Sequence, residues 1–252
     1  MTAGSFPELV LLSTIMGFSI FLSLPVIFAR NIGSKTITKL TAIAVGILVF
    51  LLADVFSDVT GDLYPGGSYV ANPAVAIIFL AGAGGSFAVL LLLQGRKTDH
   101  NGAVKPMHMS VIVAIAIGFQ NLTEGLVFGA NWNTGLYGFV LVIFVGFILQ
   151  NFTEGFPIVS PFLGSQAPRT NLLILLFMIG AMPTVAGALT GFYLDIPYLN
   201  VAFDSLAIGS IFYIILPMLN MVFNQSRHHV PGKTAYTGLI TGFLVGFLVN
   251  II

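Results

Sequence analysis

The sequence has few of the residues that soluble proteins place on their surfaces. Only 7% of its 252 residues are Asp, Glu, Lys or Arg, whereas 57% are hydrophobic. A water-soluble domain of this length needs a much larger charged fraction to cover its surface. Cysteine is absent, which excludes disulfides and thiolate metal ligands. The formal net charge is zero, so a general electrostatic attraction to nucleic acid is not expected.

The apolar residues form eight runs of about 20 residues, the length that crosses a ~30 Å hydrocarbon core as a helix. These runs cover residues 7–29, 37–57, 72–94, 107–130, 136–158, 171–193, 201–223 and 234–252. They do not alternate polar with apolar residues, as the strands of a membrane barrel would. No basic residue precedes the first run, which therefore lacks the pattern of a signal peptide. The sequence predicts an all-α, multi-pass protein of the cell membrane, with residues 1–252 forming one transmembrane domain.

The basic residues are confined to alternate links between these runs and to the flanks of those links. They are Arg30, Lys35, Lys39, Arg96, Lys97, Lys105, Arg169, Arg227 and Lys233. The opposite links carry only acids, including Asp58, Asp62 and Asp195. By the positive-inside rule, the basic links face the cytoplasm and both termini lie outside it. The longest basic link, about residues 95–108, is predicted to be a flexible cytoplasmic loop.

A polar motif interrupts the fourth apolar run and returns in the fifth. It is QNLTEG at residues 120–125 and QNFTEG at residues 150–155. The polar positions i, i+1 and i+4 fall within an arc of about 100° on a helix, so each set points one way. We expect the two arcs to face each other and to bring together four amides and two carboxylates: Gln120, Asn121, Glu124, Gln150, Asn151 and Glu154.

Polar groups at this depth need a reason, because an ionised side chain at mid-membrane costs at least ~2.5–3.5 kcal/mol. Two neighbouring carboxylates would repel, and at least one would take up a proton. A divalent cation between them removes the conflict, and amide oxygens can fill its remaining coordination positions. Gly125 and Gly155 are expected to let the two helices approach closely. The alternative is that the amides only join helices through hydrogen bonds, although that role does not need matched carboxylates.

The paired motifs make the sequence similar to the ZIP (ZRT/IRT-like) family of divalent metal transporters. Bacterial and archaeal members carry a His-Asn-x-Pro-Glu-Gly type motif in the fourth helix and a near copy in the fifth, and the two motifs build a metal site. The resemblance implies eight helices in a 3+2+3 inverted-repeat bundle with both termini extracytoplasmic, assembled as a homodimer. It also implies an elevator-like or rocking movement that carries zinc, or a harder ion such as manganese, iron or magnesium, across the membrane.

This sequence departs from the family pattern at several positions. Gln120 stands where the fourth helix usually has His, and Thr123 and Thr153 replace the usual Pro. Met182 stands where many members have a Glu that helps to complete a second metal site, so a two-metal centre is in doubt. Carboxylate and amide oxygens suit Mn²⁺, Mg²⁺ or Ca²⁺, whereas imidazole and thiolate favour zinc. We therefore hypothesise an oxygen-rich site with a weaker zinc preference than that of a His-bearing relative.

Three further acids and the four histidines each allow two interpretations, one functional and one not. Asp54 and Asp58 lie one turn apart near the outer end of the second run, and Asp204 lies near the outer end of the seventh. They form either an access pathway that concentrates cations or only the membrane boundary. All four histidines, His100, His108, His228 and His229, fall in the predicted cytoplasmic links. There they either pass metal onward or are simply solvated.

Other functions receive less support from the sequence. No GxxxxGK[ST] motif is present, so we expect no bound nucleotide and transport driven by gradients. An intramembrane hydrolase would need HExxH or a base beside its nucleophile, and no such pair is found, so we expect no enzymatic activity. A non-transporting homologue that senses metal or acts as a scaffold remains open.

Overall fold

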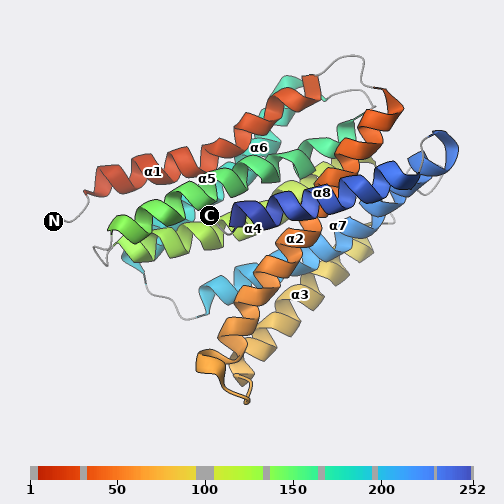
Figure 1. Ribbon diagram of the computed structural model, residues 1–252. Coiled ribbons are helices and arrows are strands. Elements are labelled where there is room, and N and C mark those ends of the chain that lie inside the picture. The colour runs from red at the N-terminus through yellow and green to blue at the C-terminus, as the bar shows by residue number, and fades with distance from the viewer. Residues whose placement is uncertain are drawn as a thin grey trace.

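The computed structural model describes residues 5–28, 33–94, 105–132, 137–163, 168–194, 198–229 and 232–250, and all regular structure in these ranges is helical (Figure 1). The α-helices are α1 (Phe6–Phe18), α2 (Ser34–Leu63), α3 (Pro73–Gln94), α4 (Pro106–Trp132), α5 (Tyr137–Val159), α6 (Thr170–Tyr193), α7 (Leu199–His229) and α8 (Gly232–Asn250). The 3-10 segment η1 (Ser19–Phe28) continues α1, and short 3-10 turns lie at η2 (Pro65–Gly67) and η3 (Ser160–Phe162).

The predicted helical membrane architecture is confirmed at this level. Each α-helix overlaps one of the eight apolar runs. Seven helical segments within the described ranges are long and apolar enough to cross a membrane. The chain is therefore a membrane-embedded helical protein. The membrane in which it resides, its orientation there and the 3+2+3 repeat stay predictions.

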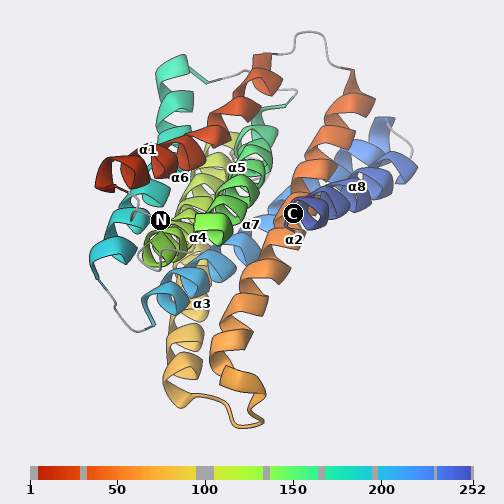
Figure 2. The same ribbon diagram turned by 60° about the vertical axis from the view of Figure 1, so that its left-hand side comes forward.

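The helices pack into two groups. Helices α1, α4, α5 and α6 form the first group, and α2, α3, α7 and α8 form the second (Figure 2). Within the first group the closest pair is α4 with α6, and within the second it is α2 with α8. The groups meet mainly where α4 contacts α7 and where α2 contacts α5. The two polar motifs, on α4 and α5, therefore lie beside the boundary between the groups.

Glycine makes the closest helix contacts possible, but not between the helices that the sequence suggested. A Cβ at Gly125 would collide with the Thr184 carbonyl of α6, and one at Gly155 would collide with Ser23 of η1. The prediction that these two glycines bring α4 and α5 together is therefore wrong. Gly125 instead serves the α4–α6 contact, and Gly155 lets η1 lie directly against α5.

Two helices extend beyond the predicted apolar runs. Helix α2 continues to Leu63, so Asp58 and Asp62 lie on a helix and not in a link. His108 lies in the first turn of α4, and His228 and His229 end α7, which corrects their assignment to links. The apolar pattern marks only the part of a helix that contacts lipid or protein core, and the helix itself can continue into polar surroundings. Of the predicted loop at about 95–108, residues 95–104, with His100, fall outside the described residues, and α4 begins at Pro106.

Candidate metal site

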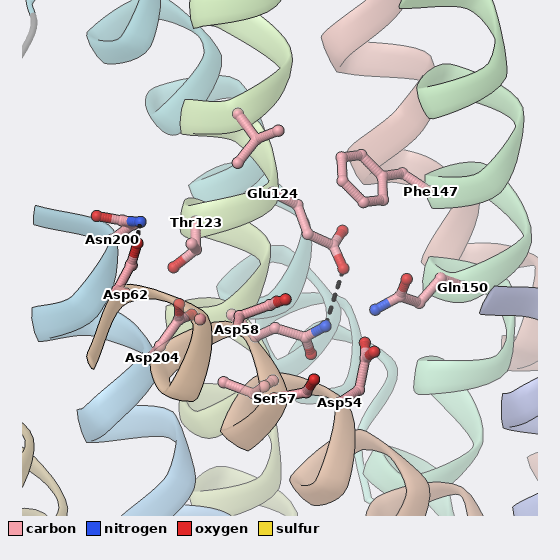
Figure 3. A pocket seen from close by; sticks show the side chains of 14 residues that line it. Asp54, Ser57, Asp58, Asp62, Thr123, Glu124, Phe147, Gln150, Asn200 and Asp204 are labelled. Carbon is pink, nitrogen blue, oxygen red and sulfur yellow. Dashed lines mark hydrogen bonds between the residues drawn. The ribbon is translucent and has the colours of Figure 1, made fainter. Parts of the chain in front are cut away.

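A cavity of about 540 Å³ lies between the two helix groups, with α2 and α7 on one side and α4 and α5 on the other (Figure 3). Its polar lining consists of Asp54, Ser57, Asp58 and Asp62 from α2, Gln120, Thr123 and Glu124 from α4, Gln150 from α5, and Asn200 and Asp204 from α7. Five of these ten residues are acids, and no described lining residue is basic. The cavity is therefore suited to attract cations.

The acids of α2 form a row along the cavity. Asp54, Asp58 and Asp62 follow one another at intervals of four residues, which places them on one helix face. Asp58 is exposed, whereas Asp204 on the facing helix α7 is only 3% exposed. The Asn200 side-chain nitrogen donates a hydrogen bond to Asp62 Oδ2 over 3.1 Å, which ties α7 to α2 at the cavity wall. The three residues predicted as an access pathway thus share one cavity.

Three residues of the repeated motifs form the buried end of this cavity. Gln120, Glu124 and Gln150 are each at most 8% exposed. The Gln120 side-chain nitrogen donates to Glu124 Oε1 over 2.9 Å, one helical turn away, as the dashed line in Figure 3 shows. The Glu124 carboxylate projects into the space between α4 and α5, and the Gln150 side chain points into the same space from α5.

The other three motif residues form a deeper layer that does not line the cavity. Asn121, Asn151 and Glu154 are all 0% exposed. The Asn121 side-chain nitrogen donates to Asn151 Oδ1 over 2.7 Å and to the Gly180 carbonyl of α6 over 3.0 Å. The Asn151 nitrogen donates to the Phe147 carbonyl over 2.9 Å and, at 3.4 Å, to Glu124 Oε2. The two motifs therefore face each other, as the sequence predicts, and their amide N–H groups are largely used.

Several oxygens of these motifs have no such partners. Both carboxylate oxygens of Glu154, together with Gln120 Oε1 and Asn121 Oδ1, are buried and accept no hydrogen bond from any described residue. The Gln150, Asn121 and Gln120 amides lie close enough to act electrostatically on Glu154, but none meets hydrogen-bond geometry. Each buried acceptor left unsatisfied costs about 1–3 kcal/mol. The arrangement therefore has four oxygen acceptors that a cation, a proton or water can satisfy.

The charges of Glu124 and Glu154 are close enough to interact. In the described part of the chain, no three His, Cys, Asp or Glu side chains lie close enough to hold one metal ion. A metal in this layer would therefore take its ligands from these two carboxylates and from amide oxygens or water. This donor set contains only oxygen, the ligand atom that hard divalent ions prefer.

Some positions at which this sequence differs from the ZIP pattern lie in this site and others do not, and the nearest histidine of α4 lies outside it. Met182 is 47% exposed and does not line the cavity, so it adds no ligand there. His108 lies more than three helical turns, or about 18 Å, before Gln120 along α4. Gln120, in contrast, lies within the site, and Thr123 lines the cavity beside it.

Four polar lining residues were not proposed as site residues from the sequence: Ser57, Asp62, Thr123 and Asn200. Asp62 continues the four-residue spacing of Asp54 and Asp58, and Asn200 precedes Asp204 by the same interval. That periodicity was a usable signal. It was missed because both residues were placed in links between helices, where helical spacing has no meaning.

In comparisons with known proteins, no family model matches the chain and no curated protein matches it. The similarity to the ZIP family therefore rests on the paired motifs and the helix order alone, and membership stays a prediction.

Proposed function

We propose that this protein transports a divalent metal cation across the membrane through the site between α4 and α5. The observation that carries the proposal is the meeting of the two motifs. Asn121 and Asn151, which are equivalent residues 30 positions apart, pair directly, and the two motifs leave four buried oxygens unpartnered at the end of an acidic cavity. An arrangement that only joined helices would match its acceptors with donors.

Electrostatics gives the cavity and the buried layer distinct roles. The exposed Asp58 and the acids beside it raise the local concentration of cations, because low-dielectric walls focus the field of a few charges. Deeper in the protein, the ion exchanges water for the oxygens of Glu124, Glu154 and the amides. Two carboxylates balance the charge of one divalent ion, so the loaded site is close to neutral.

Passage beyond this layer needs a conformational change, because Asn121, Asn151 and Glu154 have no exposed surface. The cavity lies along the boundary between the two helix groups, and relative movement of those groups would change access to it. The ZIP resemblance suggests an elevator-like or rocking movement in a homodimer. Without a nucleotide-binding motif in the sequence, ion gradients would drive the transport.

Uptake of ions into proteoliposomes tests this proposal. Zn²⁺, Mn²⁺, Fe²⁺, Co²⁺, Cd²⁺ and Mg²⁺ are offered separately to the wild type and to Glu124→Gln and Glu154→Gln. We expect uptake of at least one ion, reduced about tenfold or more in both variants, since each removes half of the compensating charge. Glu8→Gln is the matched control, because Glu8 is exposed on α1 and does not line the cavity.

The same experiment separates transport from the alternatives. A metal sensor or scaffold would bind ions in a manner that depends on Glu124 and Glu154 without carrying them into vesicles. Uptake that is unchanged in both Glu variants would contradict the site assignment. The described cavity lining contains acids, amides and hydroxyls but no histidine, so a hydrolase that uses a histidine base would not find it there.

A further inference from the structure

We infer that the transported ion is a hard divalent cation bound through oxygen atoms alone, and that Gln120 is the residue that weakens the preference of the site for zinc. The inference rests on the proposed function and specifies its substrate class. It is carried by the identity of the buried donor atoms and by their lack of hydrogen-bond partners, and not by the acidity of the cavity.

The first observation concerns the available donor atoms. The described side chains at the cavity and below it offer carboxylate, amide and hydroxyl oxygens, and the chain has no cysteine. The nearest histidine along α4, His108, is about 18 Å from Gln120. Neither thiolate nor imidazole, the ligands that favour zinc, is therefore present in the described site.

The second observation concerns the direction of the amides. The nitrogens of Gln120, Asn121 and Asn151 are engaged as hydrogen-bond donors to Glu124, to Asn151 and Gly180, and to Phe147. These bonds fix each amide, and they leave Gln120 Oε1 and Asn121 Oδ1 as acceptors without partners. Both oxygens are therefore available as ligands of the kind that a hard cation prefers.

Gln120 has a special position among these residues. It lines the cavity, is only 4% exposed, and has an unpartnered oxygen, whereas Asn121 and Glu154 lie deeper and do not line the cavity. An ion that leaves the cavity for the buried layer would meet the Gln120 oxygen beside the Glu124 carboxylate. An imidazole at this position would replace an oxygen donor with a nitrogen donor, and nitrogen donors shift preference toward zinc.

The test measures binding on the purified full-length protein in detergent, by isothermal titration or by competition. Mn²⁺, Mg²⁺, Ca²⁺, Zn²⁺ and Cd²⁺ are compared for the wild type, Gln120→His and Gln120→Glu. The control Thr36→His adds an imidazole at an exposed position of α2, outside the cavity lining and with no other histidine within four residues. We expect the ratio of zinc to manganese affinity to rise about tenfold or more in Gln120→His and to stay unchanged in Gln120→Glu and Thr36→His.

The outcomes separate the inference from the proposed function. A wild type that prefers Zn²⁺ or Cd²⁺ to Mn²⁺ by more than about 100-fold overturns the inference and leaves transport intact, since simple oxygen sites do not discriminate so strongly. An unchanged affinity ratio in folded Gln120→His also overturns it. If that variant does not fold, the wild-type ratio decides alone. A wild type that binds none of the five ions overturns both proposals.

Discussion

The side chains of Asn121 and Asn151, the equivalent residues of the two motifs, meet in the protein core. The Asn121 nitrogen donates a hydrogen bond to Asn151 Oδ1 over 2.7 Å, and both residues are 0% exposed. The bond joins α4 to α5 in the buried layer, outside the lining of the acidic cavity. It therefore fixes the relative position of the two helices that hold the candidate metal ligands.

This pair gives the first prediction. Asn121→Leu leaves Asn151 Oδ1 and the Gly180 carbonyl without their donor, so we expect a loss of about 1–3 kcal/mol in the free energy of unfolding. Denaturation in detergent measures it. In the double variant Asn121→Leu/Asn151→Leu, the loss should be smaller than the sum of the single losses, because the two residues share one bond. A loss in the double variant equal to the sum of the two single losses would contradict the coupling between Asn121 and Asn151.

Asn224→Leu is the control for this pair. Asn224 donates to Asn220 over 2.9 Å at an exposed position, so its replacement should change the free energy of unfolding by no more than about 0.5 kcal/mol.

The second prediction concerns Glu154, whose buried carboxylate has no hydrogen-bond donor among the described residues. In chelator-treated protein, Glu154→Gln should raise the melting temperature, because it removes a buried carboxylate that accepts no hydrogen bond from a described residue. The same variant should lose the stabilisation that added metal gives to the wild type. Thermal unfolding with and without Mn²⁺ measures both effects.

Glu8→Gln controls for the chemical change in that experiment. Glu8 is exposed and accepts the Ser5 backbone N–H over 2.8 Å in a capping box that glutamine can also complete. Glu8→Gln should leave the melting temperature unchanged both with and without Mn²⁺. A Glu154→Gln protein that is less stable without metal, or equally stabilised by metal, would exclude the proposed role of Glu154.

The third prediction separates the two interpretations of the cavity acids. If they concentrate cations, Asp58→Asn should weaken apparent ion affinity at low ionic strength. The difference from the wild type should largely disappear at about 1 M salt, where the Debye length falls to about 3 Å. The apparent ion affinity is measured from the concentration dependence of uptake at low salt and at about 1 M salt. An affinity equal to the wild type at low salt would instead favour a simple boundary role.

The fourth prediction concerns helix packing. A Cβ at Gly129 of α4 would collide with the Ala188 carbonyl of α6, whereas one at Gly84 of α3 would meet nothing within 4 Å. Gly129→Ala should therefore destabilise the protein by about 1–3 kcal/mol. Gly84→Ala should be neutral or slightly stabilising, by up to about 1 kcal/mol, because alanine favours helix. Equal effects in thermal unfolding would contradict the described α4–α6 contact.

Much of the fold follows from the sequence because each apolar run must satisfy its backbone within a helix. The sequence also predicts that the two motifs face each other, because lipid offers polar groups no partners. The residues concerned are Gln120, Asn121 and Glu124 on α4, and Gln150, Asn151 and Glu154 on α5. The helices that pack against Gly125 and Gly155 cannot be predicted from the sequence. A glycine permits close approach on its own side of a helix, and only the tertiary structure decides which neighbour, α6 or η1, occupies that side.

The C-terminal end of α2 shows a second limit. Hydropathy ends the helix at residue 57, whereas the structure continues it to Leu63. Asp58 and Asp62 are tolerated there because they face a cavity shared with α7 and not lipid. The four-residue spacing of these acids is visible in the sequence. That they line a cavity depends on the position of α7, which the sequence does not give.

The central claim is that a divalent cation binds between Glu124 and Glu154. Its most direct test is a crystal structure of the protein with bound Mn²⁺, in which anomalous scattering locates the ion. We predict an anomalous peak between α4 and α5, within coordinating distance of both carboxylates and of the Gln120 or Asn121 oxygen. Mn²⁺ bound only at other positions, with the Glu154 carboxylate still without a cation, would contradict the account.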